Sequence, residues 1–185
     1  MSTALKIAVI GPSQGGKSIL ANHISRIDFP EQDKDHKYDP TVGVRILKFV
    51  LEAETTAEIE LWDCSGDQEY EDCWPAILKD LHGIVAVFNG NSQDQYHSAK
   101  IWAEWFATNA GLGNGQAVMF AITTDASQRW APHSFVSGDV TVNVPVVRVS
   151  TEITTDASGN TTTFARSSFN AFVRTVERAL IERGH

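Results

Sequence analysis

The chain has 185 residues, a length that suits one compact domain with a sizeable core. Its apolar fraction of 42% is ordinary for a globular protein. A formal net charge of −8 at pH 7 disfavours nucleic acid and anionic membranes as main partners, because both attract basic surfaces.

Short apolar runs alternate with segments of helical periodicity along the chain. This alternation predicts an α/β fold, in which a six-stranded and mostly parallel sheet carries helices on both faces. We expect strands near residues 4–10, 44–51, 57–63, 83–89, 117–123 and 145–149. We expect helices near residues 17–27, 69–80, 93–110 and 165–183.

Residues 11–18, GPSQGGKS, fill every fixed position of the phosphate-binding loop G-x-x-x-x-G-K-[ST]. The loop follows a strand-like run and opens a helix-like stretch, so its backbone N–H groups and the helix N-terminus can face an anion. Lys17 would reach the β- and γ-phosphates, and the Ser18 hydroxyl would bind Mg²⁺. We predict nucleotide contacts from Ser13, Gln14, Gly15, Gly16, Lys17, Ser18 and Ile19.

Only residues 52–56 separate the second strand from the third, a connection too short for a crossover. These strands should form an antiparallel hairpin at the edge of the sheet. The motif YDPTVG (38–43) comes just before this hairpin, and the motif DCSGD (63–67) ends it.

The two motifs that flank the hairpin add the remaining groups of a triphosphate site. Asp63, at the end of a strand beside the phosphate loop, can hold Mg²⁺ directly or through water. Thr41 can close on the metal and the γ-phosphate, and Gly66 can offer its N–H to that phosphate. The predicted metal ligands are Ser18, Thr41 and Asp63.

In this order, the motifs resemble those of the small GTPases of the Ras superfamily. Within it, the chain is most similar to the Rab-like subunits of the intraflagellar transport particle. The narrower similarity rests on YDPTVGVRIL (38–47), LWDCSGD (61–67), CWPA (73–76) and HGIV (82–85). It covers most of residues 5–123 and fades beyond them.

The resemblance implies one P-loop GTPase-like domain over residues 1–185, which binds GTP or GDP with Mg²⁺. It also implies a protein of the cilium or flagellum that docks onto coiled-coil subunits of the particle through two switch loops. The two cysteines suggest reduced thiols and a cytoplasmic location. The ends of the sequence carry no lipidation pattern, so we expect no direct membrane anchor. The acidic net charge predicts no nucleic acid partner.

The base-recognition motif departs from the family pattern. Family members carry N-K-x-D after the fifth strand, whereas residues 122–125 read ITTD. Asp125 can still accept guanine hydrogen bonds, but a role in a turn is equally open. Selectivity for guanine over adenine is therefore implied by the family and not by these residues. Other candidate base contacts, each with a competing loop or core role, are Phe29, Ser150 and Thr151.

The catalytic position departs as well. Family members place a Gln after the switch glycine to orient water, whereas this chain has Asp67, followed by Gln68. A carboxylate beside the phosphates would cost about 3 kcal/mol at about 5 Å and an effective dielectric of about 20. We expect slow or negligible hydrolysis, with Gln68 as the substitute if the loop shifts.

Aromatic residues mark a second region of interest. Trp74 is either a core anchor or a partner hot spot, and we favour the core. Ile101 and Trp105 lie off the main apolar stripe of their helix. They mark either a partner surface or a broad core that absorbs both, and we favour the core. Residues 124–144 resist assignment, and residues 150–163 have the composition of a loose surface loop.

Two other functions share the phosphate loop. A small kinase acting on a nucleotide or metabolite needs an arginine-rich lid, for which only Arg129 and Arg148 are suitably placed. A pseudo-GTPase scaffold would bind nucleotide for stability and never cycle. Phosphate transfer, hydrolysis and nucleotide release would separate these alternatives.

Overall fold

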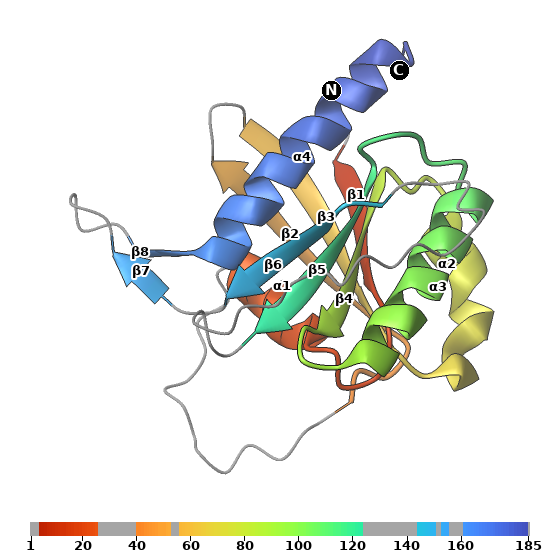
Figure 1. Cartoon of the computed structure of the whole chain (residues 1–185). Coiled ribbons are helices and arrows are strands. Elements are labelled where there is room, and N and C mark those ends of the chain that lie inside the picture. The colour runs from red at the N-terminus through yellow and green to blue at the C-terminus, as the bar shows by residue number, and fades with distance from the viewer. Residues whose placement is uncertain are drawn as a thin grey trace.

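The centre of the molecule is a six-stranded sheet with the order β2-β3-β1-β4-β5-β6 (Figure 1). β2 runs antiparallel to β3, and every other neighbouring pair is parallel. The mostly parallel sheet with an antiparallel edge hairpin is confirmed. Its strands are β1 (Leu5–Ile10), β2 (Val44–Glu52), β3 (Thr56–Cys64), β4 (Gly83–Asn89), β5 (Ala117–Thr123) and β6 (Val146–Ser150).

This computed structural model describes residues 4–25, 40–52, 56–123, 144–150, 153–155 and 161–184. Three of the predicted base contacts, Phe29, Asp125 and Thr151, lie outside these ranges. For Ser150 the backbone is described and the side chain is not.

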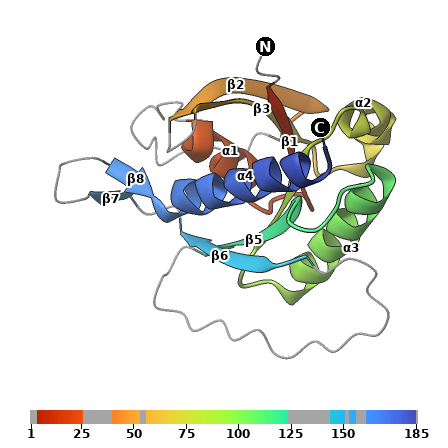
Figure 2. The same ribbon diagram turned by 90° about the horizontal axis from the view of Figure 1, so that it is seen from above.

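Helices cover both faces of the sheet (Figure 2). One face carries α1 (Lys17–Ser25) and α4 (Phe164–Glu182), and the other carries α2 (Trp74–Leu78) and α3 (Gln93–Asn109). Successive residues of a strand point to opposite faces. In β1, Ile7 and Val9 accordingly pack under α1 and α4, while Ala8 and Ile10 pack under α2 and α3.

The single helix expected near residues 69–80 is wrong, because the segment divides in two. A 3-10 helix, η1 (Gln68–Cys73), precedes the short helix α2. Tyr70 has the non-helical angles φ −100° and ψ 20°, which interrupt the first turn. Pro75 lacks an N–H and stands at the start of α2, where an N–H is not required.

The loose loop expected over residues 150–163 contains a small hairpin. β7 (Ile153–Thr155) pairs antiparallel with β8 (Thr161–Thr163). Five of these six residues are threonines, whose branched side chains favour extended backbone. The polar composition suggested a loop, but the backbone preference of threonine produced strands.

Lys6 fixes the end of α2 to the sheet. Its Nζ donates to the carbonyls of Ala76 and Lys79, each at 2.7 Å, and lies 3.7 Å from the ring centroid of Trp62. Carbonyls in the last turn of a helix have no partner inside it, so an ammonium stabilises them. Burial lowers the pKa of Lys6, and the charge of Asp80 opposes this effect.

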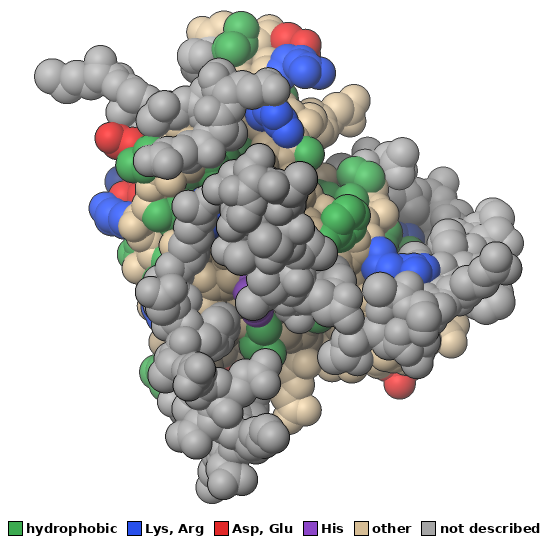
Figure 3. Space-filling view, turned by 90° about the vertical axis from the view of Figure 1, so that its left-hand side faces the viewer, with side chains coloured by type: hydrophobic (Ala, Val, Ile, Leu, Met, Phe, Trp, Pro, Cys, Tyr) green, Lys and Arg blue, Asp and Glu red, His purple; other side chains and the backbone are tan. Residues whose placement is uncertain are grey.

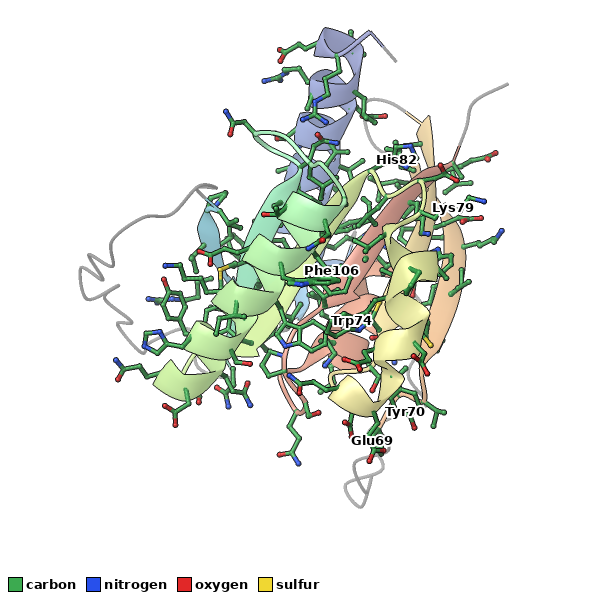
Figure 4. All side chains as sticks on the ribbon, turned by 90° about the vertical axis from the view of Figure 1, so that its right-hand side faces the viewer. Glu69, Tyr70, Trp74, Lys79, His82 and Phe106 are labelled. Carbon is green, nitrogen blue, oxygen red and sulfur yellow. The ribbon has the colours of Figure 1, made fainter. Side chains whose placement is uncertain are left out.

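An aromatic cluster joins α2 to α3. The ring of Trp74 lies 5.4 Å from Trp102, 4.7 Å from Trp105 and 5.5 Å from Phe106, centroid to centroid. Figure 4 shows Trp74 and Phe106 meeting between the two helices. Trp74 therefore anchors packing, as expected. The expectation that the core absorbs Ile101 and Trp105 is wrong, because Trp105 is 39% exposed and Ile101 is 66% exposed.

The described helices use their apolar side chains mainly for packing on the sheet. On the face seen in Figure 3, the described apolar side chains form small separate groups among polar and charged ones. Among the described residues, no helix combines the length and apolar character that a bilayer span requires.

Candidate nucleotide-binding site

A cleft of about 730 Å³ opens at the carboxyl end of β1, where the chain turns into α1. Ligands of open α/β sheets bind at this edge. The cleft brings together the phosphate loop and the two motifs that flank the β2–β3 hairpin. Its lining consists of Ser13, Gln14, Gly15, Gly16, Lys17, Ser18, Ile19, Pro40, Thr41, Val42, Cys64, Ser65, Gly66, Asp67 and Tyr70.

Close approach to β4 gives the phosphate loop its shape. A Cβ at Gly11 would lie 2.4 Å from the carbonyl oxygen of Val87, and one at Gly15 would lie 2.8 Å from the same atom. Gly11 also has a φ of +130°, which side chains rarely tolerate. The glycines of the motif therefore let the backbone turn tightly enough to leave its N–H groups for an anion.

Lys17 is buried at the floor of the cleft. Its Nζ donates to the Pro12 carbonyl at 2.8 Å, within the phosphate loop itself. Burial lowers the pKa of Lys17, while the negative charge of Asp63 opposes this effect. Gly66 lies directly against this group, because a Cβ there would be only 2.5 Å from Nζ. Sequence reasoning thus correctly brings Lys17 and Gly66 together.

The three predicted metal ligands also meet. The hydroxyls of Ser18 and Thr41 are 2.8 Å apart, although they come from α1 and the segment before β2. Asp63 is fully buried at the end of β3. Burial raises the pKa of Asp63, and the neighbouring Ser18 hydroxyl and the Arg45 and Lys17 charges act in the opposite direction.

This donor set fits Mg²⁺. Two hydroxyls and a carboxylate are the hard oxygen ligands that magnesium prefers. The Oδ1 atom of Asp63 is buried and has no hydrogen-bond partner among the described residues. An unpartnered buried carboxylate oxygen is costly, and a cation or its bound water would compensate it.

Arg45 is a residue of the site that sequence reasoning missed. It stands opposite Asp63 in the antiparallel register of β2 and β3. Its Nη2 donates to Asp63 Oδ2 at 3.0 Å and to Asn22 Oδ1, on α1, at 2.7 Å. A signal was available, because Arg45 and Asp63 are equidistant from Glu54 in the expected turn.

The two predicted switch segments touch beside the cleft. The Ser65 N–H donates to the Gly43 carbonyl at 2.7 Å. A Cβ at Gly43 would lie 3.9 Å from the Tyr70 ring. The two segments are therefore in direct contact. Tyr70 is another cleft residue that no motif indicated, and Figure 4 shows it beside Glu69 on η1.

The two candidate catalytic residues, Asp67 and Gln68, lie in different environments. Asp67 lines the cleft, but its carboxylate accepts the Glu69 N–H at 3.0 Å and so caps η1. Its own N–H donates to the Ser65 hydroxyl at 3.2 Å. Gln68 is exposed at the first position of η1 and is not part of the lining. The Asp67 carboxylate is thus engaged in a cap, and the Gln68 amide lies outside the lining.

The end of β5 has an apolar residue, Ile122, where the family's base-recognition motif begins with a polar one. The Ile122 side chain lies 3.4 Å from the place that a Cβ at Gly16 would take. Thr123 is buried, and its hydroxyl has no hydrogen-bond partner among the described residues. β5 therefore supports the phosphate loop through packing, without the Asn and Lys of the usual motif.

Exposed residues, most of them polar, complete the rim of the cleft. Ser13 and Gln14 are exposed, and Ile19 is 51% exposed where it lines the cleft. Gln95 from α3 reaches the loop, because its Nε2 donates to the Ser13 carbonyl at 3.4 Å while its Oε1 accepts the Asn89 N–H. Sequence reasoning did not include Gln95.

Comparison with known proteins agrees with this geometry. Residues 6–176 match the model of the Ras family. The chain belongs to the Ras family. This Ras family chain is 38% identical over 122 residues to the human intraflagellar transport protein 22 homolog. The match covers 63% of each protein, so the chain matches less than two thirds of that relative's length.

Solved structures show the same fold. The GTP-bound crystal structure of T. brucei IFT22/74/81 has a TM-score of 0.71 at 20% identity. The GDP-bound crystal structure of T. brucei IFT22 has a TM-score of 0.62 at 22% identity. Each comparison covers 98% of this Ras family chain and 99% of the other chain. The resemblance to small GTPases drawn from the motifs is confirmed.

Proposed function

We propose that this protein binds GTP and GDP with Mg²⁺ and serves as a small GTPase subunit of the intraflagellar transport particle in the cilium or flagellum. The observation that carries the proposal is the convergence of Lys17, the Ser18–Thr41 hydroxyl pair and Gly66 on one cleft. The similarity to intraflagellar transport protein 22 homologs supports the choice of particle. Membership of the Ras family favours a GTPase over a small kinase.

Each group of the cleft has a distinct part in binding. Lys17 would exchange the Pro12 carbonyl for phosphate oxygens, a charge-assisted contact that is stronger than the one it replaces. The backbone of the phosphate loop would donate to the same phosphates. Ser18, Thr41 and Asp63 would hold Mg²⁺, which neutralises charge on the phosphate oxygens when it is bound.

The third phosphate would be sensed through the two switch segments. Gly66 lies against Lys17, and Thr41 lies against Ser18, so both are positioned to contact a γ-phosphate or its metal. The Ser65–Gly43 hydrogen bond would pass a change at one segment to the other. Hydrolysis would be slow or negligible, because Asp67 caps η1 and carries a charge that the phosphates repel.

Calorimetric titration with GTP, GDP, ATP and ADP tests nucleotide binding directly. Each titration is done with Mg²⁺ and with chelator. We expect GTP and GDP to bind more tightly than the adenine nucleotides. Failure of all four to bind, by a protein that circular dichroism shows to be folded, would refute the proposed site.

Partner docking is proposed to use the switch segments. Coiled-coil subunits of the particle would contact residues near Val42, which is 75% exposed beside Thr41. We expect Val42→Asp to reduce co-purification with those subunits while nucleotide binding stays unchanged. Val50→Asp is the matched control, since Val50 is 48% exposed farther along the same hairpin. Normal assembly of the Val42→Asp protein would exclude this docking surface.

A further inference from the structure

Arg45 occupies an unusual place beside the proposed metal ligands. It is paired with Asp63, whose side chain is fully buried, while the Arg45 side chain is 41% exposed. The same Nη2 atom also holds the Asn22 amide oxygen. Asn22 lies one turn after Ser18 on α1, so a single guanidinium joins β2, β3 and the helix that follows the phosphate loop.

The pairing divides the two oxygens of the Asp63 carboxylate between different tasks. Oδ2 is bound to the guanidinium, whereas Oδ1 has no hydrogen-bond partner among the described residues. One atom of the guanidinium, Nη2, thus binds one oxygen of the carboxylate and the Asn22 amide oxygen together. The other carboxylate oxygen, Oδ1, is left for a cation or a bound water.

The charge of Arg45 has a second effect. It neutralises the carboxylate that would otherwise attract a divalent cation, and it repels that cation directly. Coulomb interactions over a few ångströms are strong where one partner is buried, even at an effective dielectric of about 20. Cation affinity at this site is therefore lower than the same oxygen ligands would give without Arg45.

We propose that Arg45 is a positioning residue that holds Asp63 and makes nucleotide binding by this protein only weakly dependent on divalent cations. The inference rests on the proposed nucleotide site. Phosphate binding would then depend mainly on Lys17 and the loop backbone, which need no metal. A nucleotide would stay bound when magnesium is scarce.

The direct test measures Mn²⁺ affinity of the full chain loaded with GDP, by electron paramagnetic resonance. Arg45→Gln removes the charge, and we expect it to bind Mn²⁺ at least about tenfold more tightly than the wild type. Lys48→Gln is the matched control, because Lys48 lies on the same strand and pairs with Glu60 at the surface. We expect its Mn²⁺ affinity to stay within about twofold of the wild type, as exposed pairs contribute little.

Nucleotide release gives a second readout. We expect EDTA to accelerate release of fluorescent GDP by a larger factor in Arg45→Gln than in the wild type. Arg45→Lys keeps the charge, so its response to EDTA should resemble that of the wild type. Arg45→Met removes the charge while keeping an apolar stem, and it replaces Arg45→Gln if the latter fails to fold.

The outcomes separate the inference from the proposed function. Unchanged or weaker Mn²⁺ binding by Arg45→Gln overturns the inference, even if GDP binds normally. Failure of the wild type to bind GDP, both with Mn²⁺ and in EDTA, instead overturns the proposed nucleotide site. Tighter Mn²⁺ binding by Arg45→Gln alone, with Lys48→Gln unchanged, supports the role of Arg45.

Discussion

The phosphate loop and the end of β5, where the family's base-recognition motif begins, are built on different principles. At the phosphate loop, backbone geometry and buried polar groups converge, as the contacts of Gly15, Lys17 and Ser18 show. At the end of β5, Ile122 packs against the phosphate loop and Thr123 is buried in place of a charged residue. A close-packed loop tolerates few changes. In the proposed nucleotide site, base recognition could therefore weaken without loss of phosphate binding, and affinity and selectivity would depend on separate segments.

The largest effect on nucleotide affinity is expected from removal of the Lys17 ammonium group, the cation of the phosphate loop. We expect Lys17→Ala to reduce affinity for GTP and GDP by about 100-fold or more, since charged hydrogen bonds contribute up to about 3 kcal/mol. Calorimetry measures the change. Lys79→Ala, which alters an exposed lysine away from the cleft, should have no effect. Equal affinities for Lys17→Ala and the wild type would contradict the assignment.

A smaller effect is expected at the switch glycine. A Cβ at Gly66 would lie 2.5 Å from both Lys17 Nζ and the Ser13 nitrogen, so Gly66→Ala must push the segment away from the loop. We expect GTP affinity to fall by about tenfold, the loss of roughly one hydrogen bond and its geometry. GDP lacks the third phosphate and serves as the internal control. An equal loss for both nucleotides would show that Gly66 does not read the third phosphate.

The smallest effect on nucleotide affinity is expected at the candidate base contact Asp125. We predict that Asp125→Ala lowers GTP affinity by about fivefold, close to 1 kcal/mol, and leaves ATP affinity unchanged. Competition binding with labelled GDP measures both ratios. If GTP and ATP affinities change together, Asp125 acts on the loop and not on the base.

A pH experiment probes a region far from both of these segments. His82 precedes β4, and its Nδ1 accepts the Lys6 N–H at 3.0 Å. Burial lowers the pKa of His82 below its ordinary value of 6.5, Asp80 opposes this effect and the Lys6 charge adds to it. The unfolded chain then binds more protons below pH 6.5, so the free energy of unfolding falls as pH drops through that value.

Urea unfolding at pH 7.5 and pH 5.5 measures this small effect. His82→Gln keeps an acceptor for Lys6 without a titrating group, and we expect its stability to depend less on pH. The exposed His97→Gln provides the control. A pH dependence unchanged by His82→Gln would assign it to other groups.

The motifs allowed the spatial grouping of the phosphate loop with Thr41 and Gly66 to be predicted. The fixed positions of residues 11–18 identify a loop whose function depends on backbone, and the flanking strand and helix have strong apolar periodicity. The β2–β3 hairpin followed from one short connection. These features are local in sequence, which is why they can be read from it.

Contacts between distant elements were harder to predict. The Arg45–Asp63–Asn22 arrangement needs the strand register together with the position of α1, and no short motif encodes both. The interruption within η1 depends on a single residue, Tyr70, whose backbone leaves the helical region. The threonine hairpin was missed because polarity and β propensity pointed in opposite directions.

The indole cluster between α2 and α3 has an optical consequence. Trp74 follows η1 directly and lies within 5.5 Å of two other indole rings, centroid to centroid. Near-ultraviolet circular dichroism and intrinsic emission depend on such spacing, so both signals report on the segment that begins after Gly66. The unlabelled protein thus carries its own spectroscopic probe of this segment.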